Sequence, residues 1–154
     1  MRRIPLLAAL VVALASVPSS AVAASAASGV SLTGGSGRVV MTLRGSVLGT
    51  LDRGKITVGL NGGGTQIYVD GTNLKQHTLV DGRVAYTGTD LRFRVFRGGW
   101  RVVIDGTGIN ASAGGRGLIS LRGTGEYSID GRAPLQWTST WQAIRLGPRS
   151  QKAA

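Results

Sequence analysis

The stretch Leu91–Asp105, LRFRVFRGGWRVVID, decides the fold that this sequence predicts. Two apolar-rich runs flank Gly98-Gly99, and glycine adopts the positive φ angles that a two-residue hairpin turn needs. The sequence therefore predicts a β-hairpin in which Phe96 lies opposite Arg101. Side chains alternate along each strand, so one hairpin face is apolar and is expected in the core. That face carries Leu91, Phe93, Val95, Val102 and Ile104, with Trp100 at the tip.

The other face of the predicted hairpin is basic and has one aromatic ring between arginines. It carries Arg92, Arg94, Phe96, Arg101, Val103 and Asp105. Guanidinium groups bind phosphate or sulfate, and a phenyl ring stacks on a base or a sugar. The pattern predicts a polyanion-binding surface formed by Arg92, Arg94, Phe96, Arg97 and Arg101, extended by Arg44 and Arg122 if these face outward. The alternative is a solvated face whose charges prevent the strand from associating with other strands.

Short strands and glycine turns continue over the rest of the chain after Gly29. The runs 55–60 and 65–69 are joined by Asn61 and three glycines, and Asp-Gly pairs recur at 70, 81, 105 and 130. No window after the N-terminal segment shows sustained helical periodicity. The sequence therefore predicts one all-β domain over residues 29–146. Its expected form is an antiparallel β-sandwich or a closed β-barrel of about nine or ten short strands.

A weak internal repeat relates two segments that lie 78 positions apart. Residues 37–54 read GRVVMTLRGSVLGTLDRG, and residues 115–132 read GRGLISLRGTGEYSIDGR. The shared LRG core keeps one register through to the aspartates. This favours two equivalent strand-bulge-strand units, with Gly45 and Gly123 at bends, over coincidence in a glycine-rich and arginine-rich chain.

The N-terminal segment has the organisation of a Sec-type signal peptide. Two arginines precede a short apolar run, and Ala21-Val22-Ala23 forms a small-residue cleavage site. We expect a signal peptide over residues 1–23, a flexible linker over 24–28 and a disordered basic tail over 147–154. The apolar run is short for a membrane span. The expected product is secreted or associated with the cell envelope, without integral membrane association after cleavage.

The chain is strongly basic and has no cysteine. Its formal net charge is +11, and removal of Arg2 and Arg3 with the signal peptide leaves +9. Zero cysteines exclude a disulfide framework, so the fold must rest on burial. The positive charge predicts attraction to anionic partners. The expected partners are an anionic wall polymer, an acidic polysaccharide or extracellular nucleic acid.

The residue types that catalysis and metal binding require are scarce in this sequence. It has one histidine, His77, one glutamate, Glu126, and aspartates that mostly stand beside glycine in turn positions. No nucleophile-elbow, phosphate-loop or zinc-ligand pattern is present. We therefore expect a protein that is not an enzyme and that has no catalytic residues, no metal and no cofactor.

Two alternative functions remain open at this point. Tryptophans can provide flat platforms for sugar rings when they are exposed. Trp100, Trp137 and Trp141 are the candidates for such a glycan-binding module, and in an extended strand Trp137 and Trp141 would share a face. The other alternative is a structural envelope protein that associates with itself through strand edges.

Several of these runs together resemble a pattern in small exported all-β proteins of high-GC bacteria. The pattern comprises LRFR at 91–94, GGWRV at 98–102, GTGI at 106–109 and GRG at 115–117. The resemblance covers about residues 37–125. It implies an exported all-β domain and brings no activity with it.

Overall fold

The computed structural model describes residues 29–147, and these form a single antiparallel β-sheet of five strands. The strands are β1 (Gly29–Leu60), β2 (Gln66–Thr78), β3 (Val84–Ile129), β4 (Leu135–Gln136) and β5 (Gln142–Leu146). β1 and β3 account for most of the sheet, while β2, β4 and β5 all pair with β3. The predicted all-β, antiparallel character is confirmed.

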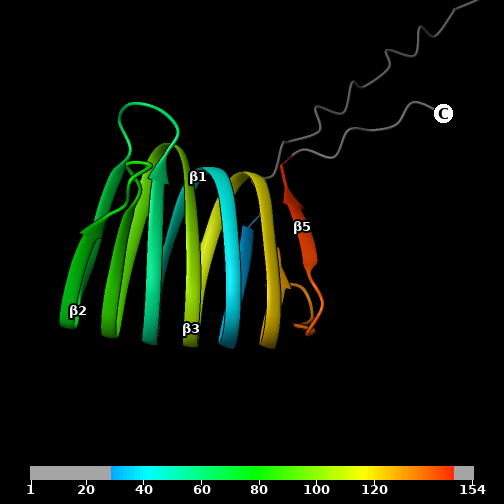
Figure 1. Cartoon of the computed structure of the whole chain (residues 1–154). Coiled ribbons are helices and arrows are strands. Elements are labelled where there is room, and N and C mark those ends of the chain that lie inside the picture. Colours follow the sequence, from blue (N-terminus) through cyan, green and yellow to red (C-terminus); the bar gives the residue numbers. More distant parts are fainter. Residues whose placement is uncertain (1–28, 148–154) are drawn as a thin grey trace, which may run out of the picture.

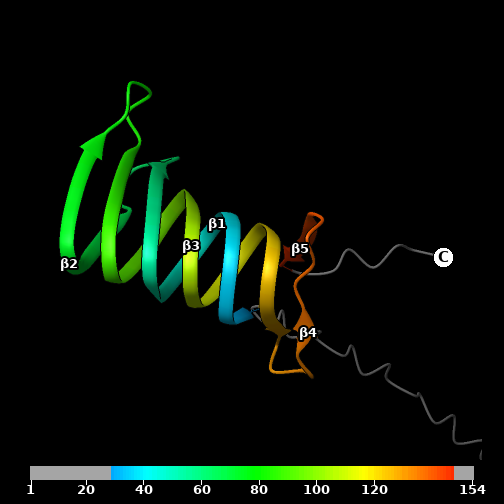
Figure 2. The ribbon, with the colours of Figure 1, turned by 60° about the horizontal axis from the view of Figure 1, so that its bottom comes forward.

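The two long strands wind around a common axis as a coil. Most central residues of β1 pair with two residues of β3, one on either side, and Met41 pairs with both Val102 and Ile119. These two partners are 17 residues apart in the sequence, so one turn of the coil takes about that many residues. Figures 1 and 2 show the successive turns of β1 and β3, with β2 at one end of the coil and β5 at the other.

Glycines stand where the long strands bend between half-turns. Gly37 pairs with Gly106 and Gly123, and Gly45 pairs with Gly115. Gly37 has φ 140° and Gly123 has φ 133°, which L-residues rarely adopt. The backbones also approach closely, because a Cβ on Gly37 would meet the Arg122 carbonyl and the Gly123 Cα. Glycine at these positions lets a strand bend without losing its pairing, and so a strand can run for several half-turns.

The bends divide the coil into two sides. Residues 38–44, 55–60, 75–78, 84–87, 100–105, 116–122 and 142–146 pair with one another on what we call the basic side. Residues 29–35, 46–52, 66–70, 91–96, 108–113 and 124–129 pair on what we call the groove side. Half a turn of about nine residues separates the two sides along either long strand.

The core fills the interior of the coil from both sides. The six residues that the sequence assigned to the core face of the hairpin are all buried, at 4% exposure or less. Trp100 is fully buried, and its Nε1 donates a hydrogen bond to the Gly45 carbonyl oxygen at 3.1 Å. This bond joins β3 to the bend of β1 and fixes the bulkiest core side chain.

The predicted hairpin at Gly98-Gly99 is wrong. β3 runs through these residues without reversing, and Phe96 pairs with Ser46 and Gln66 instead of Arg101. Ser46 pairs with Phe96 while Arg44 pairs with Gly99, so two residues of β3 stand opposite the single Gly45. The extra residue makes a β-bulge, and positive φ angles at Arg97 and Gly98 bend the strand there.

The predicted nine or ten short strands in a sandwich or barrel are not confirmed. The sheet has five strands and is not closed, because glycines carry β1 and β3 through bends where the sequence predicted turns. Asp81-Gly82 and Asp130-Gly131 do lie in turns, whereas Asp105-Gly106 lies inside β3. The predicted signal peptide, the linker and nearly all of the tail lie outside the described residues. Residues 29–147 contain no helix long and apolar enough to cross a membrane.

The structure also relates the two repeat segments to each other. Residues 37–45 pair with residues 115–123 in antiparallel register, and the equivalent residues Met41 and Ile119 pair directly. This pair therefore lies at the centre of a local two-fold relation. Gly45 and Gly123 both lie at bends, as the repeat predicted.

Candidate polyanion-binding surface

A row of charged side chains crosses the strands of the basic side. Lys75 and Lys55 both pair with Thr87, Asp105 pairs with Lys55 and Arg38, and Arg38 pairs with Arg122. The four cations of this row are exposed. Because neighbouring strands are about 4.8 Å apart, the row spans roughly 24 Å along the coil axis.

A second row of cations runs parallel to the first. On each strand, its position lies four residues away from the position that belongs to the first row. Arg101 pairs with Gly59 and Thr42, and Leu118 continues the row from Thr42 to Arg145. The Arg83 side chain extends the row beyond Gly59, because a Cβ on Gly59 would contact its Cγ at 3.1 Å. Four residues of strand place the rows on the order of 13 Å apart at the backbone.

A strip of small side chains lies between the two rows. It is formed by Ala85, Thr57, Val103, Val40, Ser120 and Ala143. By the alternation of side chains along their strands, Thr57 and Val103 face outward. Their side chains are nevertheless only 6% and 5% exposed. Long Lys and Arg side chains on both sides cover such positions with their aliphatic stems and keep their charged ends in water. The basic side therefore carries two rows of cations on either side of a covered strip of small side chains.

Ion pairing leaves most of these cations available. In the described part of the chain, Arg38 forms an ion pair with Asp105 and Arg83 forms one with Asp81, with nitrogen–oxygen distances of 3.5 Å and 2.6 Å. The Arg83 guanidinium donates a hydrogen bond to Asp81 and holds the pKa of that carboxyl below its usual value. Five cations of the two rows form no ion pair within residues 29–147: Lys55, Lys75, Arg101, Arg122 and Arg145.

The structure does not bring the predicted arginines onto one face. Arg92 and Arg94 lie on the groove side, where they pair with Thr50 and Leu48. Arg101 lies half a turn away on the basic side, because the chain bends at Arg97 and Gly98. Phe96 remains on the same side as Arg92 and Arg94, and its ring stacks on Tyr68 with centroids 6.0 Å apart.

The other predicted basic residues lie on or beside the basic side. Arg122 is exposed in the first row, and its guanidinium lies 5.0 Å from the centre of the Trp141 ring. Arg44 is exposed beside the bend at Gly45, where it pairs with Arg116. Arg97 is exposed at the bulge on the same edge of the coil. Arg44 and Arg122 thus face outward, but they extend the surface around Arg101 rather than the one around Arg92.

The three tryptophans have different environments. Trp100 is fully buried and Trp137 is 4% exposed, so neither offers a ring face to a ligand. A Cβ on Gly35 would overlap the Trp137 ring, which shows how closely that ring packs on the backbone. Trp141 is 49% exposed and stacks with Arg122. The segment between β4 and β5 is not extended, so Trp137 and Trp141 do not share a face.

Sequence reasoning missed Arg38, Lys55, Lys75 and Arg145 as members of one surface. These residues come from three strands, β1, β2 and β5, and only the long-range register places them in rows. A local signal existed for part of the set. In 37–44 and 115–122 the repeat places arginines at both ends of a strand, at positions that alternate outward.

The surface has the chemistry of charge recognition. Within residues 29–147, no group of three His, Cys, Asp or Glu side chains could hold a metal ion. The cations of the two rows are guanidinium and ammonium donors, which bind phosphate, sulfate and carboxylate. Comparison of the chain with models of known protein families, with curated proteins and with solved structures finds no match.

Proposed function

We propose that this is an exported, non-catalytic protein that binds an anionic polymer of the cell envelope through the basic side. The observation that carries the proposal is the pair of cation rows on either side of the strip at Thr57 and Val103. The signal-like start of the sequence supports export. The net charge is +11 for the full chain and +9 without Arg2 and Arg3, and it supports attraction to polyanions over a distance.

The arrangement favours a polymer over a small anion. The cations do not converge on a point, as they do where one phosphate is held. They repeat along roughly 24 Å of the coil axis at multiples of the strand spacing. A chain with regularly spaced negative charges can meet several of them at once, and each contact releases a counterion.

Salt dependence of binding tests this proposal. Short duplex DNA serves as a polyanion whose salt response is calibrated, and purified cell wall serves as the envelope ligand. If five unpaired cations meet phosphates, the logarithm of the binding constant should fall with the logarithm of salt at a slope of about −4 to −5. Lys55→Gln with Arg101→Gln should reduce the slope by about 2 and weaken binding by at least about tenfold.

The matched control is Arg92→Gln with Arg94→Gln, which removes the same charge from the groove side. Its salt slope should equal that of the unmodified protein. A slope near zero for the unmodified protein would contradict the proposal. So would equal losses in the two double variants, because net charge alone would then explain the binding.

A further inference from the structure

The groove side carries a second surface with different chemistry. A groove of about 900 Å³ crosses its strands from Ser31 to Tyr68. Its floor is backbone, because Leu32, Gly49, Phe93 and Ala111 lie between outward positions and their side chains are absent or point into the core. One wall is formed by Ser31, Ser112, Leu48, Arg94 and Tyr68, and the other by Thr33, Asn110, Thr50, Arg92 and Asp70.

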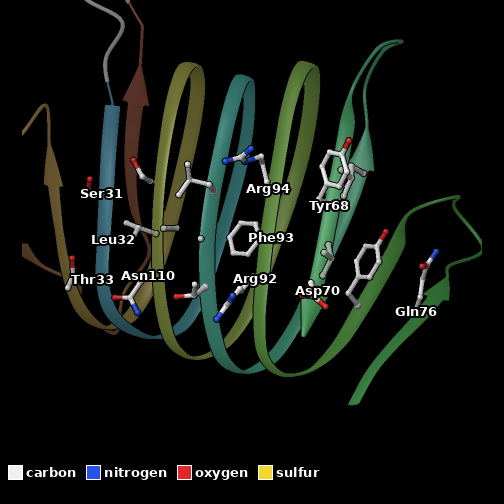
Figure 3. A pocket seen from close by; sticks show the side chains of 18 residues that line it. Ser31, Leu32, Thr33, Tyr68, Asp70, Gln76, Arg92, Phe93, Arg94 and Asn110 are labelled. Carbon is white, nitrogen blue, oxygen red and sulfur yellow. The ribbon is translucent and has the colours of Figure 1, made fainter. Parts of the chain in front are cut away.

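The groove walls carry planar and hydroxyl groups that have few partners of their own. Figure 3 shows Arg94 and Arg92 on opposite sides of Phe93, with Tyr68 and Asp70 beyond them. Neither arginine forms an ion pair within the described residues. The Asn110 amide accepts a hydrogen bond from the Gly34 N–H and donates one to the Gly108 carbonyl. Asn110 is thus fixed in place and keeps one N–H and one lone pair for a ligand.

An aromatic ring is held at one end of the groove. Tyr68 is 62% exposed, and its ring lies within 10° of parallel to the Phe96 ring. The stacking restricts the Tyr68 side chain while most of its surface stays in water. An oriented, exposed ring beside hydrogen-bonding groups suits a ligand with an apolar face and polar edges.

We propose that this groove binds a linear glycan. A sugar ring has an apolar face that can stack on Tyr68 and hydroxyls that can reach Arg92, Arg94 and Asn110. The five strand segments that the groove crosses give it a length of roughly 19 Å, enough for an oligosaccharide rather than a single sugar. This site shares none of the tryptophans that the sequence suggested for glycan binding.

Other extended ligands fit the groove less well. A peptide strand gains affinity by pairing with a sheet edge, but the groove floor is a sheet face whose backbone groups already pair within the sheet. A nucleic acid needs several cations, whereas Arg92 and Arg94 share the groove with Asp70. The proposal is independent of polyanion binding, because the groove is lined by the groove side except for Gln76 and Tyr86 at its β2 end, and by none of the cations of the two rows.

An oligosaccharide array tests the proposal. The probes are linear chains of glucose, N-acetylglucosamine, mannose, galactose and galacturonate, from disaccharides to hexasaccharides, applied to the unmodified protein. The array is read at a salt concentration that abolishes DNA binding, so that the basic side does not contribute. We expect binding to at least one series, with affinity rising with chain length until the groove is spanned.

Variants then locate the binding. Tyr68→Ala and the double variant Arg92→Ala with Arg94→Ala should each weaken binding to that series at least tenfold. These side chains are exposed, so circular dichroism should show an unchanged fold. The basic-side variant Lys55→Gln with Arg101→Gln should bind the array normally. Absence of binding across the whole array, or binding that survives both groove variants, would overturn the proposal.

Discussion

Replacing Trp100 with alanine is expected to lower the free energy of unfolding by about 3–5 kcal/mol. The indole is fully buried in the interior of the coil, and its Nε1–H bonds to the Gly45 carbonyl at 3.1 Å. The substitution removes the packing of a large ring and leaves that carbonyl without this donor. Urea denaturation of the protein without its predicted signal peptide measures the change.

Two further variants separate the contributions of Trp100. Trp100→Phe keeps an aromatic ring and loses the hydrogen bond, so its cost should be smaller than that of alanine by at least about 1 kcal/mol. Trp141→Ala removes a half-exposed indole and should cost less than about 1 kcal/mol. If Trp100→Ala and Trp141→Ala unfolded at the same urea concentration, the assigned core would be incorrect.

Replacing Gly123 with alanine is expected to lower the free energy of unfolding by about 3 kcal/mol or more. Gly123 has φ 133°, and a Cβ there would overlap the Ser36 carbonyl oxygen and lie 3.0 Å from the Gly37 Cα. Both atoms belong to the backbone of the paired strand, so a side-chain rotation cannot relieve the overlap. The bend would have to open, and pairing between β1 and β3 would be lost around it.

The matched control for this substitution is Gly114→Ala. Gly114 lies in β3 next to a bend, but its φ is not positive and a Cβ there would meet nothing within 4 Å. Its free energy of unfolding should change by no more than about 0.5 kcal/mol. Equal stability of the Gly123 and Gly114 variants in urea denaturation would show that close backbone contact at glycine bends does not hold the coil together.

Alternation along single strands was a reliable guide to burial in this chain. Leu91, Phe93 and Val95 are buried while Arg92 and Arg94 are exposed, because each strand has one interior and one exterior face. The repeat also located the bends at Gly45 and Gly123. Both inferences depend on short-range patterns, which the coil preserves.

The same short-range patterns could not predict the path of the chain. Gly98-Gly99 satisfies the requirements of a hairpin turn, yet the strand continues because β1 supplies partners to β3 on both sides of the bulge. Arg38 lies 67 positions from its neighbour Asp105, and no local feature indicates that register. The predicted binding site depended on the predicted hairpin. Arg101 was therefore grouped with Arg92, and the two rows of cations were missed.

NMR can identify directly which side of the coil binds a polyanion. Amide chemical shifts of the isotope-labelled protein, without its predicted signal peptide, are recorded by NMR while short duplex DNA is added at low salt. We expect the largest changes in residues 38–44, 55–60, 100–105 and 116–122, and little change in residues 46–52, 91–96 and 108–113. The largest changes in the second set, or changes spread evenly over both sets, would contradict the assignment of polyanion binding to the basic side.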